Sequence, residues 1–234
     1  MNKLENHHSN RIWEIDFLRG IALILMMLFH FLYDLNAFYH VEIPYWDSFW
    51  VIEGKISAVL FMILAGISST FSKNNLKRGL KILLVAMGIS LVTYIIFPSE
   101  YIRFGILHML GSSMILYHFI YNISLSFTLM ISLIIFLLGY LFNHFYIDTN
   151  LLIPFGIMSR DFVSMDYYPL FPWLGVFLIG TIIGKSIYKE KKSILQKFYR
   201  NNFLSFLGRH SLIVYLIHQP VILLLLYFFF SVRN

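Results

Sequence analysis

This 234-residue sequence lacks cysteine and has few charged residues. Without cysteine there is no disulfide, no thiolate metal site and no cysteine nucleophile. Charged residues make up 13% of the chain, against roughly 25% in an average soluble domain. So few charges cannot cover a water-exposed surface, which indicates an integral membrane protein. The net charge of +6 then reflects loops that face anionic lipid rather than a nucleic-acid partner.

Long apolar runs fill most of the chain. A membrane-spanning helix needs about 20 mainly apolar residues, and this rule predicts an all-α transmembrane bundle with about seven spans. We expect one membrane domain over residues 1–234, with a cytoplasmic tail at residues 1–14. The expected spans are residues 15–36, 48–70, 78–97, 104–121, 124–144, 168–187 and 209–230.

Lysine and arginine are distributed unevenly between the connections. They concentrate in the tail, in the loop around residues 73–81 and in the loop at residues 185–200, whereas the alternate connections carry one or none. Because positive loops stay in the cytoplasm, the N-terminus is predicted to be cytoplasmic and the C-terminus to be outside. We expect a multi-pass protein of the plasma membrane.

Four ionisable residues lie in the first apolar run: Asp16, Arg19, His30 and Asp34. Arg19 and His30 are eleven residues apart, so they share one helix face at a separation of about 16 Å. Asp16 can pair with Arg19, and Asp34 is placed to orient His30 as a general base. Ionisable groups in a bilayer are costly and mark functional sites, so this helix is the first candidate.

Other spans also carry polar residues. His108 is expected just inside the outer end of its span, where it serves the site or is a hydrogen-bonded histidine between helices. Ser211, Tyr215 and His218 share a face of the last span, in which Pro220 frees a carbonyl near residue 216 for His218 or Gln219. His118 and His144 are expected at the interfaces. The Gly180-x-x-x-Gly184 pair predicts close helix packing, within the chain or in a homodimer.

Four stretches together resemble the catalytic domain of heparan-α-glucosaminide N-acetyltransferase. They are residues 16–22 (DFLRGIA), 104–111 (FGILHMLG), 168–175 (YPLFPWLG) and 208–218 (GRHSLIVYLIH), in this order along the chain. The first stretch, extended to His30, also resembles the Arg-x10-His signature of membrane acyltransferases of the acyltransferase-3 type. The resemblance implies an all-helical membrane enzyme that takes acetyl-CoA from the cytosol, without a metal. The acyl group passes to an acceptor on the far side of the bilayer, such as a glycan or an amino sugar.

The resemblance also implies roles for individual residues. His30 stands where the lysosomal members have asparagine, and His40 lies near the place of their essential lumenal histidine. The base is therefore His30 or His40, and the acyltransferase-3 signature favours His30. Arg19, paired with Asp16 and helped by a cytoplasmic basic group, would hold the CoA phosphates, and His218 would contribute to acyl-CoA binding. The basic helpers are Lys77, Arg78 or Lys81, and the donors to the oxyanion are Ser211, Tyr215 or His108.

Two other functions use the same residues. A transporter or flippase would employ the buried charges as a substrate or proton relay, although the sequence has no inverted repeat. A b-type haem protein would bind iron through His30 and His218. The sequence leaves open the acceptor, the acyl chain length, the choice between direct transfer and an acyl-enzyme, and the oligomeric state.

Overall fold

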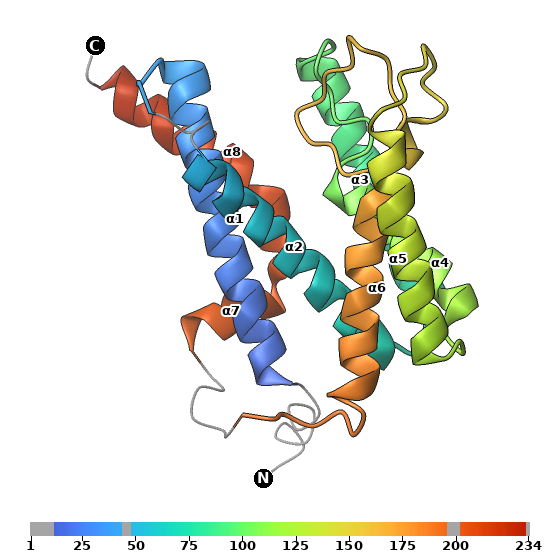
Figure 1. The fold of residues 1–234 in the computed structure, drawn as a ribbon. Coiled ribbons are helices and arrows are strands. Elements are labelled where there is room, and N and C mark those ends of the chain that lie inside the picture. Colours follow the sequence, from blue (N-terminus) through green and yellow to red (C-terminus); the bar gives the residue numbers. More distant parts are fainter. Residues whose placement is uncertain (1–11, 44–47, 196–201, 233–234) are drawn as a thin grey trace. The chain divides into compact units, whose positions relative to one another are not determined.

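The computed structural model describes residues 12–43, 48–195 and 202–232, and the described chain is helical (Figure 1). Its helices are α1 (Trp13–Tyr39), α2 (Ser48–Phe71), α3 (Asn75–Ile96), α4 (Ile106–Ile120), α5 (Leu125–Phe142), α6 (Leu170–Ser186), α7 (Phe203–Arg209) and α8 (Ser211–Ser231), with a short 3-10 helix η1 (Ile153–Phe155).

The helices confirm the expected membrane bundle. Among the described residues, five helices are long and apolar enough to cross a membrane, namely α1, α2, α3, α5 and α8, while α4 and α6 are shorter apolar helices. Each of the seven expected spans begins and ends within three residues of one of these helices. The short helix α7 was not expected, because seven residues are too few to give a hydrophobic period.

Side-chain caps fix several helix starts. Asn74, Ser124 and Asn202 each precede a helix and accept a hydrogen bond from a backbone N–H in its first turn, at 2.8, 3.3 and 2.8 Å. These caps satisfy backbone donors that have no partner inside the helix. They explain why α3, α5 and α7 begin where they do.

The chain divides into two compact units. Unit 1 comprises Met1–Phe61 and Glu190–Asn234, and unit 2 comprises Met62–Lys189. Unit 1 contains α1, the first half of α2, α7 and α8. Unit 2 contains the rest of α2 with α3, α4, α5, η1 and α6. The expected single domain stays a prediction.

In unit 1, α8 lies beside α1, and α7 lies at the N-terminal end of α1 (Figure 1). Tyr39 and Phe230 stack with their ring centroids 4.3 Å apart near the far ends of α1 and α8. Gly20 and Gly208 have no room for a side chain, because a Cβ at either position would meet the backbone of α7 or α1 respectively. Backbone-to-backbone contact therefore presses α7 against the first turns of α1.

In unit 2, Gly180 and Gly184 of α6 face the second half of α2. A Cβ at Gly180 would meet the backbone of Ile63, and one at Gly184 would lie 2.6 Å from Oγ1 of Thr70. The pair is thus used for packing within the chain, which confirms the first of its two expected uses. The homodimer stays a prediction.

The expected tail overlaps the start of α1. Trp13 and Glu14 are already helical, and the Glu14 carboxylate accepts hydrogen bonds from Ser193 Oγ at 2.6 Å and from Ile194 N at 2.7 Å. Residues 1–11 of the tail lie outside the described residues. The last part of the tail is therefore tied to the segment that precedes α7.

Candidate functional site

The α1 helix runs unbroken from Trp13 to Tyr39, so Arg19 and His30 lie on one face, three turns apart. Arg19 NH1 lies 3.2 Å from Asp16 Oδ1, which confirms the expected ion pair. The two side chains are 18% and 10% exposed, so the pair is largely withdrawn from solvent. Between Arg19 and His30 the same face is apolar and buried, at Leu23 and Met26.

The main cluster of unit 1 forms where α1 meets α8. The imidazole rings of His30 and His218 have their centroids 5.0 Å apart with 59° between the ring planes. His218 is buried, and its ring also lies 5.5 Å from the ring of Tyr215. Two residues that are 188 positions apart in the sequence therefore form a pair of neighbouring imidazoles, of which His218 is buried and His30 is half-buried. We call His30, Asp34, His218 and Gln219 the α1–α8 cluster.

Asp34 does not contact His30 in the way that the sequence predicted. Its side chain is fully buried, and both carboxylate oxygens accept hydrogen bonds from Nε2 of Gln219, at 2.9 and 3.0 Å. In the described part of the chain, His30 makes no hydrogen bond with Asp34. The prediction that Asp34 orients His30 was wrong because the carboxylate turns toward the amide on α8. No signal in the sequence identified this partner, which lies 185 residues further along the chain.

The repair that the sequence predicted for the carbonyl freed by Pro220 is not observed among the described side chains of α8. Nδ1 of His218 lies 2.5 Å from the carbonyl oxygen of Tyr215, whereas residue 216 was expected. Ser211 and Tyr215 lie on α8 with His218, as predicted, and both are half-buried. His218 therefore bonds a carbonyl of the preceding turn that Pro220 does not affect, and Gln219 binds Asp34.

Several buried polar atoms of unit 1 have no hydrogen-bond partner among the described residues: Nε2 of His218, Oε1 of Gln219 and both carboxylate oxygens of Glu53. Glu53 belongs to the part of α2 that contacts α1. There Ser57 Oγ donates to the carbonyl of Ala22 at 2.8 Å, and Gly54 faces the ring of Phe29. Buried polar groups without partners are costly, so these atoms of unit 1 are candidates for hydrogen bonds to a ligand. Glu53 was not among the predicted site residues, although a carboxylate in an apolar run is the signal that could have identified it.

His108 of α4 has a different environment. Its Nδ1 accepts a hydrogen bond from Gly105 N at 3.2 Å, so Nε2 carries the proton and donates to Ser90 Oγ at 3.2 Å. Ser90 in turn donates to the carbonyl of Ile102 at 2.5 Å. Both ring nitrogens are therefore occupied within unit 2. This bonding supports the second interpretation of the sequence, a hydrogen-bonded histidine between helices, over a catalytic role.

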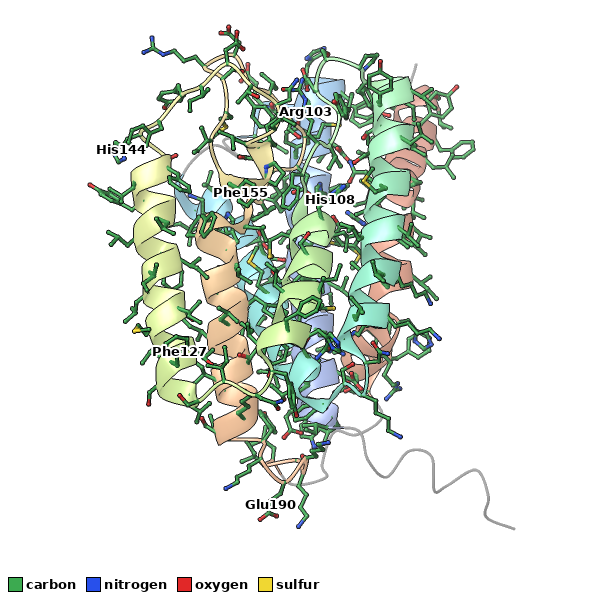
Figure 2. The ribbon with its side chains drawn as sticks, turned by 90° about the vertical axis from the view of Figure 1, so that its right-hand side faces the viewer. Arg103, His108, Phe127, His144, Phe155 and Glu190 are labelled. Atoms are coloured by element: carbon green, nitrogen blue, oxygen red, sulfur yellow. The ribbon has the colours of Figure 1, made fainter. Side chains whose placement is uncertain are left out.

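Loop residues close the same end of unit 2, where Figure 2 shows Arg103 and His108 at one end of α4. Oδ2 of Asp166 accepts a hydrogen bond from Ile106 N at 2.9 Å and so caps α4 from the connection before α6. Ser164 donates to the carbonyls of Tyr101 and Asp166, each at 3.0 Å. Burial raises the pKa of Asp166 to about 6, although the hydrogen bond from Ile106 lowers it. These contacts anchor the connection to the start of α4.

The remaining predicted residues lie apart from the α1–α8 cluster or in the other unit. His40 ends α1 in the left-handed conformation with φ 53°, and its side chain is exposed. Lys77 and Arg78 belong to unit 2, where Lys77 is exposed and Arg78 NH1 donates to the carbonyl of Ser68 at 3.4 Å. Their grouping with Arg19 stays a prediction.

The geometry of the two imidazoles disfavours the haem alternative. Histidines that bind one iron from opposite sides hold their nitrogens about 4 Å apart, since each metal–nitrogen bond is about 2 Å long. Their ring centroids would then be separated by about 6 Å. The observed 5.0 Å between the ring centroids of His30 and His218 is about 1 Å shorter than this separation.

Comparison with known proteins identifies the family. The sequence model of the catalytic domain of heparan-alpha-glucosaminide N-acetyltransferase matches residues 11–220, which include the α1–α8 cluster and both ends of α4. Neither curated proteins nor solved structures give a match. The matched range covers nearly the whole chain, so the chain belongs to the heparan-alpha-glucosaminide N-acetyltransferase catalytic-domain family and is a membrane acetyltransferase.

Proposed function

We propose that this protein transfers an acetyl group from cytosolic acetyl-CoA to a sugar or amino-sugar acceptor on the extracytoplasmic side of the plasma membrane. Members of its family use acetyl-CoA as the donor. The observation that carries the proposal is the close His30–His218 pair, which lies three turns along α1 from Arg19. A base and a cation at this spacing suit a long donor with phosphates at one end and a thioester at the other.

His30 is the proposed general base. A thioester is already activated, so the protein needs to remove the acceptor proton and to stabilise the oxyanion that forms at the thioester carbon. His30 is half-buried and has a ring nitrogen available for this proton. His40 remains the alternative base, but its exposed side chain lies about 15 Å further along the helix axis at ~1.5 Å per residue.

Arg19 is the proposed anchor for the CoA phosphates. Its guanidinium is paired with Asp16, which fixes its position, and the planar fork of N–H donors of a guanidinium suits phosphate oxygens. An extended pantetheine arm is roughly 15–20 Å long, which is close to the rise of about 16 Å between Arg19 and His30. Lys77 and Arg78 are proposed to assist, and Ser211 or Tyr215 to donate to the oxyanion.

Labelled acetyl-CoA incubated with purified protein and fractionated envelope glycans tests the transfer. We expect label in a glycan fraction with the parent protein, loss of this label with His30→Ala and its retention with His40→Ala. Full activity of His30→Ala together with an inactive His40→Ala would reassign the base. Transport of a solute without any release of CoA would favour the transporter alternative instead.

Sidedness is tested separately in proteoliposomes. With acceptor sealed inside and acetyl-CoA added outside, molecules whose cytoplasmic ends face outward should acetylate the enclosed acceptor. Molecules inserted in the opposite orientation give no product in this arrangement, so selective proteolysis of one exposed face identifies the active orientation. Product only when donor and acceptor share one compartment would contradict transfer across the bilayer.

A further inference from the structure

The tautomer of His218 follows from its surroundings. Nδ1 lies 2.5 Å from the carbonyl oxygen of Tyr215, and a carbonyl oxygen only accepts hydrogen bonds. Nδ1 therefore carries the proton of the neutral ring, and Nε2 carries a lone pair. This Nε2 atom is buried and has no partner among the described residues. His218 thus presents an unoccupied hydrogen-bond acceptor inside unit 1.

His30 is the group that can occupy this acceptor. An N–H···N hydrogen bond of about 2.9 Å in line with both rings places two imidazole centroids about 5 Å apart. The observed centroid separation is 5.0 Å, with a tilt of 59° that a modest side-chain rotation can correct. In the described part of the chain, the ring of His30 contacts Phe29 and His218 and makes no hydrogen bond. The two imidazoles are therefore complementary in distance and in available groups.

The neighbouring polar pair holds the two histidines in register. Gln219 follows His218 directly, and Asp34 lies one turn beyond His30, so the Gln219–Asp34 contact joins α8 to α1 beside the imidazoles. Because the carboxylate of Asp34 is already bound by this amide, it is not the partner of His30. A catalytic base is usually oriented by a hydrogen-bond acceptor on its second nitrogen. For His30 this acceptor is Nε2 of His218.

We propose that His218 is a positioning residue that accepts a hydrogen bond from His30 and stabilises the charge that His30 gains during acetyl transfer. The inference rests on the proposed function, in which His30 is the base. The order of groups is the Tyr215 carbonyl, Nδ1–H of His218, Nε2 of His218, the N–H of His30 and the acceptor at the other nitrogen of His30.

The proton balance is simple. As the acceptor oxygen or nitrogen bonds to the thioester carbon, its proton moves to the free ring nitrogen of His30. His30 shares its other N–H proton with Nε2 of His218. When the tetrahedral intermediate collapses, the carbon–sulfur bond breaks and the CoA thiolate takes a proton from His30. Both histidines return to their starting forms, and acetylated acceptor and CoA are the products.

Steady-state kinetics on the full chain test this arrangement. His218→Gln should lower kcat by about 100-fold and leave KM for acetyl-CoA and for acceptor within about threefold, because the change acts through His30. His218→Glu places a carboxylate that can accept from His30, and it should recover at least tenfold in kcat over His218→Gln. An unchanged kcat in His218→Gln, no recovery in His218→Glu, or a tenfold rise in acceptor KM would each overturn the proposal.

His144 provides a matched control. Its Nδ1 also lies against a backbone carbonyl, that of Tyr140 at 2.9 Å, but its ring is exposed at the end of α5 (Figure 2). His144→Gln should therefore keep the parental kcat and KM. A loss equal to that of His218→Gln would show that the effect of the substitution is nonspecific, which would overturn the proposal.

Nitrogen NMR measures the tautomer of His218 in the unsubstituted protein, so a folding defect in a variant does not affect this result. In protein labelled with 15N-histidine, the His218 signals are those lost in His218→Gln, and they should show a protonated Nδ1 and an unprotonated Nε2. A protonated Nε2 in the neutral ring would refute the proposal. If the unsubstituted protein lacked transferase activity, the proposed function would fail as well; if it were active and insensitive to His218, only this inference would fail.

Discussion

Each unit contains a buried histidine with polar neighbours, but the two sites differ in how completely their hydrogen bonds are made. In unit 2, His108 uses both ring nitrogens, and Asp166 caps the N-terminus of α4. In unit 1, Nε2 of His218 and the carboxylate of Glu53 have no partner in the described chain. Buried polar groups without partners among the described residues also occur in unit 2, at Asn75, Arg103 and Tyr117, so the contrast concerns the two histidine sites and not the units as a whole. The difference between the histidines supports the proposal that the chemistry lies in unit 1.

The largest expected effect comes from removing the base. His30→Gln should reduce kcat/KM by 10² to 10⁴-fold, the usual contribution of a general base, at unchanged protein yield. The measurement is acetyl transfer to the acceptor fraction, normalised to folded protein by size-exclusion chromatography. Retention of more than a tenth of the parental rate would place the chemistry outside the α1–α8 cluster and weaken the contrast between the units.

The next effect concerns stability in unit 1. Gln219→Leu leaves the fully buried carboxyl group of Asp34 without its donor, and it should cost about 1–3 kcal/mol of unfolding free energy. Unfolding in detergent measures the loss. Replacing both residues in Asp34→Leu/Gln219→Leu should cost less than the sum of the single changes, because no unpaired group remains. Additive losses would show that the contact contributes no coupling energy.

A loss of similar size is expected in unit 2. His108→Leu removes the acceptor for Gly105 N–H and the donor to Ser90, so it should destabilise the protein by about 1–3 kcal/mol. The turnover of the protein that remains folded should stay within about threefold of the parent. A hundredfold drop in turnover with normal stability would restore the catalytic role that the sequence had suggested for His108.

The sequence predicted the fold better than the site. Apolar runs of about 20 residues locate helices well because the bilayer fixes their length, so α1 and α8 were placed within three residues at each end. Local pairs were equally accessible, since Asp16 and Arg19 are neighbours on a helix. The Asp34–Gln219 contact was not accessible, because it depends on how two helices distant in sequence are rotated against each other. Periodicity identifies which face is apolar, but it does not identify the partner.

The last expected effect is the pH dependence of the loop that caps α4. Burial raises the pKa of Asp166 to about 6 from an ordinary value of 3.8, so the folded protein binds the proton more tightly than the unfolded chain. The stability that this group contributes is therefore complete below about pH 4, and it is lost as the pH rises to about 6. Asp166→Asn keeps an oxygen that can accept from Ile106 and cannot ionise. Its thermal midpoint should fall less than that of the parent between pH 4 and pH 7, by an amount that corresponds to about 2 kcal/mol. Parallel pH curves for the two proteins would show that the Asp166 carboxyl is solvated, and the contrast between the polar groups around α4 and the α1–α8 cluster would then be weaker.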